Sequence, residues 1–251
     1  MVSIALLAGA CSNGLDAGAA DWQPSDAPPA LLELNERIED LANERSTAGS
    51  PIIAVSQFDG FDAVDDTIDG IHPSVSGEDK LASTWVESLA PILAAHPNDE
   101  PSVLLLGDSI THNHYRAVLW RSLQEQGHRF DLIGTQNSFP VRVAVDDLSY
   151  DGVSFDTDHE GHIGWTANEI LVGSEWDPAG GGGLEEWLGG YTPDIVALHI
   201  GTNDLVIGEL TPAEIATDIG EVVDRLRLSN PDVAVLVAQI IPYIPIAEPA
   251  E

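Results

Sequence analysis

Apolar residues recur at a helical period in four parts of this chain. From Ala30 onward they follow one another at three- and four-residue steps, and Gly49-Ser-Pro51 ends the predicted helix. Helix-start signals precede two further stripes, at Ser76–Asp79 and at Thr211-Pro212-x-Glu214. The four stripes are Leu31, Leu34, Ile38 and Leu41; Leu81, Trp85 and Leu89; Tyr115, Val118, Leu119 and Leu123; and Ile215, Ile219, Val222 and Leu226.

Short apolar runs lie between these helical stripes and predict five buried strands. The runs are Ile52–Val55, Val103–Leu106, Phe130–Ile133, Ile195–Ile200 and Val233–Ile241. Strands that alternate with amphipathic helices indicate a parallel sheet covered on both faces. We therefore expect an α/β protein, a three-layer α/β/α sandwich around a five-stranded parallel sheet. The residues from Thr135 to about Tyr191 are predicted to form a long loop region.

The length of 251 residues suits one domain, which we place at residues 30–245. Residues 1–29 combine a signal-like segment with a linker rich in Gly, Ala, Asp and Pro, and residues 246–251 form a tail. The apolar stretch that ends at Cys11 resembles a secretion signal with a lipoprotein-type cysteine, although no Lys or Arg precedes it. It predicts a secreted or cell-surface protein; a stray strand or an N-terminal tail is the alternative.

The chain is strongly acidic, with 42 Asp and Glu against 9 Lys and Arg and a formal net charge of −33. Such a surface repels phosphate backbones and anionic lipids, so we expect no nucleic-acid partner and no membrane-surface binding. No apolar run is long enough to span a bilayer. The charge fits either a protein adapted to high salt or an ordinary acidic secreted enzyme. Cys11 is the single cysteine, which excludes an intrachain disulfide and a cysteine-based metal site.

Several polar residues stand where chemistry collects in parallel sheets, at the carboxyl ends of strands. Ser109 follows a buried strand and a glycine, and Asp69 precedes His72 by three residues, a spacing that lets a carboxylate hold the imidazole. Asn203 and Gly134 each follow a predicted strand and offer N–H donors. Taken singly, these residues are equally typical of a helix cap, a surface histidine and turns.

Together these residues resemble the four blocks of the SGNH (GDSL-type) hydrolase family. LLLGDSITHN around Ser109 is similar to the family's first block, DLIGTQ with Gly134 to the second, and LHIGTND with Asn203 to the third. DGIHPSVSGEDKLASTW, with Asp69 and His72, is similar to the last block. The resemblance implies a flavodoxin-like fold and a serine esterase without metal or cofactor. It makes Ser109 the nucleophile and His72 the general base held by Asp69, with the Ser109 and Gly134 N–H groups and the Asn203 side chain as oxyanion donors.

The segment DHEGHIGW at residues 158–165 is similar to secreted SGNH esterases that remove acetyl groups from xylan. The resemblance implies an acylated polysaccharide or small molecule as substrate. On physical grounds we expect His162 and Trp165 to line the substrate cleft, with Trp165 as a stacking face for a sugar ring. The alternatives are a core tryptophan and a loop histidine. A metal site at His159, Glu160 and His162 is disfavoured, because it lacks the His-Glu-x-x-His spacing. Two other functions remain open: cleavage of short-chain lipid esters or thioesters, and an inactive carbohydrate-binding or surface protein.

The order of the blocks is rotated relative to this family, because His72 precedes Ser109. Residues 30–95 resemble the family's C-terminal part and residues 101–245 its N-terminal part, which predicts a circular permutation joined through AAHPNDEPS. We expect the site to assemble within one chain, as a monomer. The alternatives are a domain-swapped oligomer, in which neighbouring copies complete each other's sites, and an inactive rearranged fragment.

Overall fold

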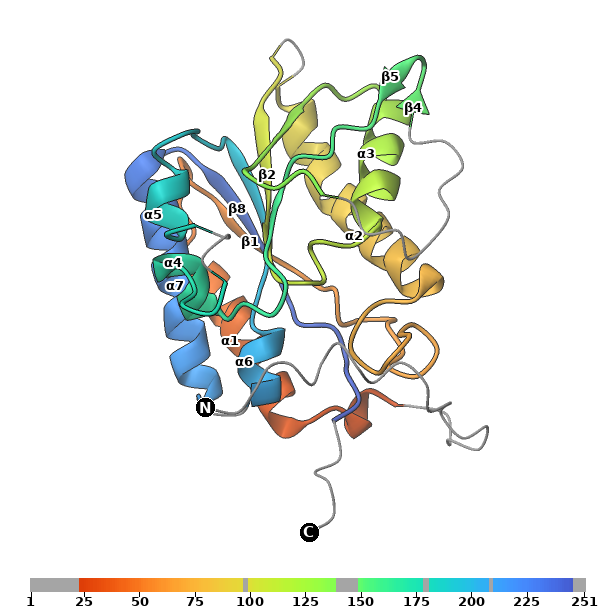
Figure 1. Cartoon of the computed structure of the whole chain (residues 1–251), viewed down its shortest axis with the longest axis vertical. Coiled ribbons are helices and arrows are strands. Elements are labelled where there is room, and N and C mark those ends of the chain that lie inside the picture. Colours follow the sequence, from red (N-terminus) through yellow and green to blue (C-terminus); the bar gives the residue numbers. More distant parts are fainter. Residues whose placement is uncertain (1–22, 97–98, 139–148, 178–180, 208–209, 246–251) are drawn as a thin grey trace.

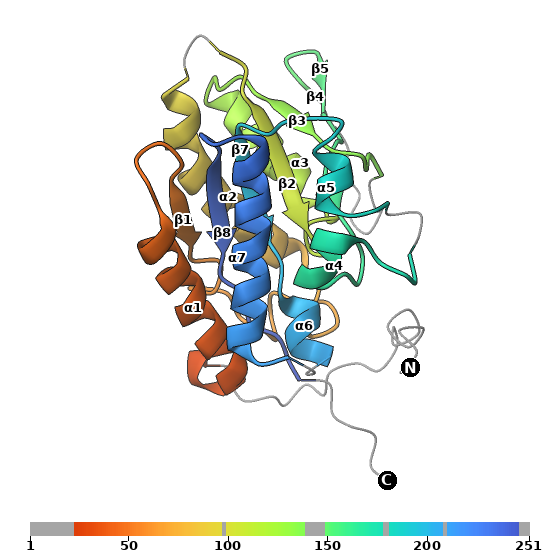
Figure 2. The ribbon, with the colours of Figure 1, turned by 90° about the vertical axis from the view of Figure 1, so that its left-hand side faces the viewer.

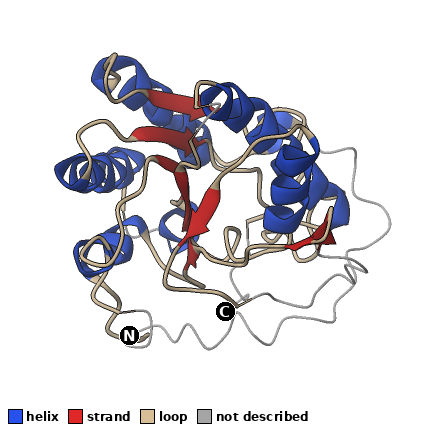
Figure 3. Cartoon of the chain, turned by 90° about the horizontal axis from the view of Figure 1, so that it is seen from above, coloured by secondary structure: helices blue, strands red, loops and turns tan. Residues whose placement is uncertain are grey.

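A mostly parallel sheet runs through the middle of the molecule, with helices on both of its faces (Figures 1 and 3). The computed structural model describes residues 23–96, 99–138, 149–177, 181–207 and 210–245. The segment around Cys11 and the tail at 246–251 lie outside the described residues. The strands are β1 (Ile52–Val55), β2 (Ser102–Gly107), β3 (Asp131–Ile133), β4 (Ser149–Tyr150), β5 (Val153–Ser154), β6 (Glu160–Gly161), β7 (Ile195–His199) and β8 (Ala234–Ala238). The helices are η2 (Pro24–Asp26), α1 (Pro29–Arg45), α2 (Val75–Ala94), α3 (Tyr115–Glu125), α4 (Ala167–Val172), α5 (Leu184–Trp187), α6 (Thr202–Ile207) and α7 (Pro212–Ser229).

The central sheet has the strand order β1-β8-β7-β2-β3, and each of these neighbouring pairs is parallel. The five predicted strands and the α/β sandwich are confirmed. A sixth strand, β6, was not predicted. The β2–β3 pairing ends at Leu104 and Ile133, and β6 then takes over beside β2, with Leu106 opposite Glu160 and Gly107 opposite Gly161. The backbone next to the carboxyl end of β2 is therefore that of β6.

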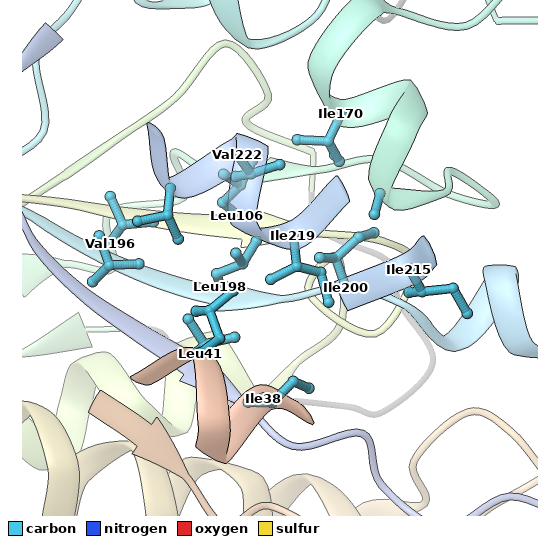
Figure 4. Close-up of a cluster of buried hydrophobic side chains, with 14 of the residues drawn as sticks. Ile38, Leu41, Leu106, Ile170, Val196, Leu198, Ile200, Ile215, Ile219 and Val222 are labelled. Carbon is cyan, nitrogen blue, oxygen red and sulfur yellow. The ribbon is translucent and has the colours of Figure 1, made fainter. Parts of the chain in front are cut away.

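Two apolar clusters join the three layers. On one face α1, α7, α4 and α5 cover the sheet (Figure 2), and on the other face α2 and α3 do. Figure 4 shows the first cluster, in which Ile38, Ile219 and Val222 pack with Val196 and Leu198 of β7. Because β2, β7 and β8 are covered on both sides, their residues are almost all buried, which explains why they form unbroken apolar runs in the sequence.

The helix starts follow from local hydrogen bonding. Thr211 caps α7 as predicted: its hydroxyl accepts from the Glu214 N–H, and the Glu214 carboxylate accepts from the Thr211 N–H at 2.8 Å. The predicted start of α2 is corrected by two residues, because Ser74 rather than Ser76 is the N-cap. The Ser76 hydroxyl donates instead to Asp66 Oδ1 at 2.8 Å, which ties the helix to the preceding loop.

The long loop predicted between Thr135 and Tyr191 contains more structure than its pattern indicates. It holds the hairpin β4–β5, strand β6 and the short helices α4 and α5, and α6 directly follows β7. These elements have two to six residues each, too few for a hydrophobic period to develop. Within the described ranges, no helix combines the length and the hydropathy that crossing a bilayer requires.

Candidate active site

Ser109 and His72 are in contact, although they stand 37 residues apart. Ser109 lies two residues beyond the end of β2, and His72 lies in the loop between β1 and α2. The distance from Ser109 Oγ to His72 Nε2 is 3.0 Å, which is hydrogen-bond reach. Both side chains are half-buried, so a substrate can approach them from solvent. The contact forms within a single chain, and no second copy is needed to bring the two groups together.

Asp69 holds the other side of the His72 ring. Its Oδ2 lies 2.7 Å from His72 Nδ1, and its Oδ1 accepts from the backbone N–H groups of Ile71 (3.0 Å) and His72 (2.7 Å). Gly70, with φ of +87°, makes the tight turn that brings the carboxylate back to the ring. Burial alone would raise the pKa of Asp69, but the hydrogen bonds from His72 and Ile71 lower it to about 2. An ionised Asp69 favours the tautomer with its proton on Nδ1, which leaves Nε2 free to accept from Ser109.

Asn203 lies at the same edge of the sheet, in the first turn of α6. The strands that lead to Asn203 and Ser109 are neighbours, since Gly107 of β2 is opposite His199 of β7. One amide hydrogen of Asn203 is donated to the Trp165 carbonyl at 2.8 Å. This bond orients the side chain and ties it to the loop that follows β6. The second amide hydrogen remains for another acceptor.

Gly134 occupies a different position in the fold. It follows β3, and a Cβ added to it would overlap the backbone of His159. It therefore packs against the start of β6, and the carboxyl end of β2, which leads to Ser109, has a different neighbour. That neighbour is the chain from Gly161 onward, and the His162 N–H donates to the Gly107 carbonyl at 2.9 Å.

His162 and Trp165 are buried in a stack of rings. The imidazole packs against both Trp165 and Trp187, with ring centroids at 4.3 and 4.5 Å, and the two indoles also pack against each other, with centroids at 5.8 Å. Trp165 is 0% and His162 is 3% exposed, so neither ring has a face open to a sugar. Their burial therefore argues against the predicted substrate-binding role of His162 and Trp165. The rings instead support the loop that carries the Trp165 carbonyl.

Glu160 sits beside this stack with no exposed surface. Its carboxylate lies 2.7 Å from His162 Nε2 and accepts from the Tyr191 hydroxyl at 2.8 Å, from the Thr135 hydroxyl at 3.0 Å and from the Thr135 N–H. Sequence reasoning missed this network. The available signal was a glutamate between two histidines, which is also typical of an exposed loop. Across the described part of the chain, no group of three His, Cys, Asp or Glu residues is arranged to hold a metal ion.

Asp108, the residue before Ser109, is completely buried. Its Oδ1 accepts from the Ile110 N–H at 2.8 Å and so shapes the turn that presents Ser109. Burial raises the pKa of Asp108 to about 7, and the nearby Asp204 carboxylate adds to this rise. The hydrogen bond from Ile110 and the charge of His72 act in the opposite direction but do not cancel it. The folded protein therefore keeps Asp108 largely protonated at mildly acidic pH.

This burial predicts a pH-dependent stability. In the unfolded chain Asp108 loses its proton near pH 4, while in the folded chain it keeps it up to about pH 7. The folded state thus binds more protons in this window, and the free energy of unfolding must fall as pH rises through it. We expect Asp108→Asn, which keeps the Oδ1 acceptor, to reduce the loss of stability between pH 5 and pH 8 by about 2 kcal/mol or more.

Urea unfolding of both proteins at the two pH values measures this difference. Burial also raises the pKa of Asp204 to about 6, so the free energy of unfolding of the variant should still fall somewhat as pH rises. Asp232 is exposed, so Asp232→Asn is the control and should lose as much free energy of unfolding between pH 5 and pH 8 as the wild type does. An equal loss of stability between pH 5 and pH 8 in Asp108→Asn and in the control would contradict the prediction.

The parallel sheet and the contacts among Ser109, His72 and Asp69 define an α/β protein with a serine hydrolase arrangement at the carboxyl edge of its strands. The model of the GDSL-like Lipase/Acylhydrolase family matches residues 105–251. The chain belongs to this family.

Several known esterases are similar to the chain. A multidomain esterase of Ruminococcus flavefaciens is 33% identical over 142 residues, which cover 51% of this chain and 17% of that protein. A carbohydrate esterase family 3 structure from Talaromyces cellulolyticus is 31% identical, over 55% of this chain and 60% of that chain, with a TM-score of 0.46. A family 3 carbohydrate esterase from Clostridium thermocellum is 29% identical, over 55% and 61% of the two chains, with a TM-score of 0.42. The chain thus spans less than two thirds of the length of each of these relatives.

Proposed function

We propose that the protein is a serine esterase that hydrolyses carboxylic esters with Ser109, His72 and Asp69. The observation that carries this proposal is the unbroken line of contacts from Ser109 Oγ to His72 Nε2 (3.0 Å) and from His72 Nδ1 to Asp69 Oδ2 (2.7 Å). A nucleophile in contact with a base, and a base oriented by a carboxylate, form the arrangement that activates a serine.

The reaction follows from these contacts. Ser109 Oγ attacks the ester carbonyl while His72 Nε2 takes the hydroxyl proton, and Asp69 stabilises the resulting imidazolium. His72 then gives the proton to the leaving alcohol oxygen, and the acyl group remains on Ser109. Water attacks the acyl-enzyme with His72 again as base, which releases the carboxylic acid and restores the serine hydroxyl.

The developing oxyanion needs donors near Ser109. We assign the Ser109 N–H and the free amide hydrogen of Asn203 to this role. The third donor, predicted at Gly134, we now propose in the loop from Gly161 to Trp165. Two contacts support this proposal: β6 lies beside the end of β2, and the Trp165 carbonyl holds Asn203.

We also propose that the chain is a circular permutation of its family. The family model matches residues 105–251 and leaves out the part that contributes β1, His72 and Asp69. In the structure β1 pairs in parallel with β8, so the first part of the chain completes the sheet at its edge. Assembly within one chain favours a monomer over a domain-swapped oligomer.

As substrate we propose an O-acetylated polysaccharide such as xylan. The similarity to carbohydrate esterases supports this choice over lipid esters or thioesters. The half-buried setting of Ser109 and His72 leaves their reacting atoms within reach of an ester carried on a polymer.

Three experiments test the function. Acetate release from acetylated xylan should exceed that from deacetylated xylan, and p-nitrophenyl acetate should be cleaved at least about tenfold faster than p-nitrophenyl octanoate. Phenylmethylsulfonyl fluoride should sulfonylate Ser109, as peptide mass spectrometry would detect. Preference for long acyl chains would favour a lipid esterase. A wild-type protein that cleaves no ester and takes up no label would leave a binding or surface protein as the remaining function.

A further inference from the structure

Trp176 lies beside the loop of the candidate active site and is partly exposed to solvent. It lies in the segment between α4 and α5 and is 45% exposed, whereas Trp165 and Trp187 are 0% and 4% exposed. Its indole therefore leaves apolar ring surface in contact with water, and tryptophan, which combines an apolar body with one N–H donor, is enriched at binding interfaces.

The Trp176 ring is held in a fixed orientation. Its Nε1 donates to Glu169 Oε1 at 2.7 Å, and the same carboxylate oxygen accepts from the Ser174 hydroxyl at 2.6 Å. The other oxygen of Glu169 accepts from the Thr166 N–H at 2.9 Å and closes the capping box of α4. Because these bonds already restrict the side chain, little rotamer freedom remains to be lost when a ligand binds.

The ring also lies against the loop of the candidate active site. A Cβ added to Gly164 would meet the six-membered part of the indole at 3.2 Å, so the two residues are neighbours. Next along the chain, Asp177 Oδ2 accepts from Trp165 Nε1 at 3.2 Å, and the Trp165 carbonyl accepts from Asn203. One short path therefore connects Trp176 to the proposed oxyanion donor.

We propose that the open face of Trp176 binds a sugar ring of the polysaccharide that carries the ester, and so selects polymeric over small substrates. This inference rests on the proposed function and assigns it a specificity-determining residue. A flat, rigid indole matches the apolar C–H face of a pyranose. The net charge of −33 favours a neutral sugar chain over anionic polymers as the occupant.

The first test compares two substrates. For Trp176→Ala, the ratio of kcat/KM for acetylated xylan to kcat/KM for p-nitrophenyl acetate should fall about tenfold, with the change mainly in KM for xylan. Trp176→Phe, which keeps an aromatic face, should recover most of the ratio. Leu228→Ala is the matched control, since this side chain on α7 is 77% exposed, and its ratio should equal that of the wild type. A Trp176→Ala ratio equal to that of Leu228→Ala would overturn the proposal.

The second test does not depend on esterase activity. Calorimetry with xylohexaose should give a dissociation constant at least about tenfold weaker for Ser109→Ala/Trp176→Ala than for Ser109→Ala alone. Equal affinities, or no binding to either variant, would overturn the role of Trp176. If the wild type hydrolyses no ester but Trp176→Ala still weakens xylohexaose binding, the proposed catalysis fails, while the proposed sugar-binding role of Trp176 holds.

Discussion

Ser109→Ala is expected to lower kcat/KM for p-nitrophenyl acetate by about 10³-fold or more. The substitution removes the oxygen that forms the acyl-enzyme, while the neighbouring donors remain and leave a small residual rate. His72→Ala should cost a similar factor, because a serine without a base in contact stays a weak nucleophile. The double variant should be little worse than either single one, since the two groups act in the same step. Initial rates at pH 8 measure all three variants.

A matched control separates this effect from a general loss of fold. Ser83 is exposed on α2, and its hydroxyl donates to the Asp79 carbonyl within the same helix. Ser83→Ala should keep the wild-type rate, and urea unfolding should show that Ser109→Ala is folded. If folded Ser109→Ala hydrolysed the ester at the wild-type rate, another nucleophile would have to be sought and the proposed function would fail.

The part of the fold that could be predicted is the part with a clear period. The runs that became β2 and β7 are apolar because both faces of these strands are covered, and the stripe on α7 repeats over about three turns, from Ile215 to Leu226. The contact between Ser109 and His72 could be predicted because family resemblance supplied both blocks. Periodicity alone gives no reason to join a serine to a histidine 37 residues before it.

The rest of the site could not be predicted, because its residues serve tertiary contacts that leave no local pattern. Strand β6 has two residues, and its Glu160 carries an ionisable side chain although it is fully buried. A polar residue between two histidines indicates a loop by composition, and only the donors supplied by Thr135 and Tyr191 make its burial favourable. No local pattern shows which tryptophan is exposed: we expected Trp165 to line the cleft, while the exposed ring belongs to Trp176.

Glu160→Ala is expected to lower the free energy of unfolding by about 3–5 kcal/mol. The carboxylate receives hydrogen bonds from Thr135, Tyr191 and His162, and alanine would leave these donors without an acceptor in the interior. Burial and the Glu160 carboxylate both raise the pKa of Tyr191, so its hydroxyl keeps its proton and remains a donor that needs an acceptor. The urea concentration at the midpoint of unfolding, together with the dependence of the free energy of unfolding on urea, measures this loss of stability.

Two variants show whether the network is the cause of this loss. Glu160→Gln keeps the size and one acceptor oxygen but turns an N–H₂ group toward the remaining donors, so it should lose stability, though less than alanine does. Glu175→Ala removes an exposed carboxylate a few residues beyond α4 and should change the free energy of unfolding by no more than about 0.5 kcal/mol. Equal stabilities for Glu160→Ala and Glu175→Ala would mean that the buried carboxylate does not support the loop from Gly161 to Trp165. In that case the orientation of Asn203 would have to depend on the stacked rings of His162, Trp165 and Trp187 alone.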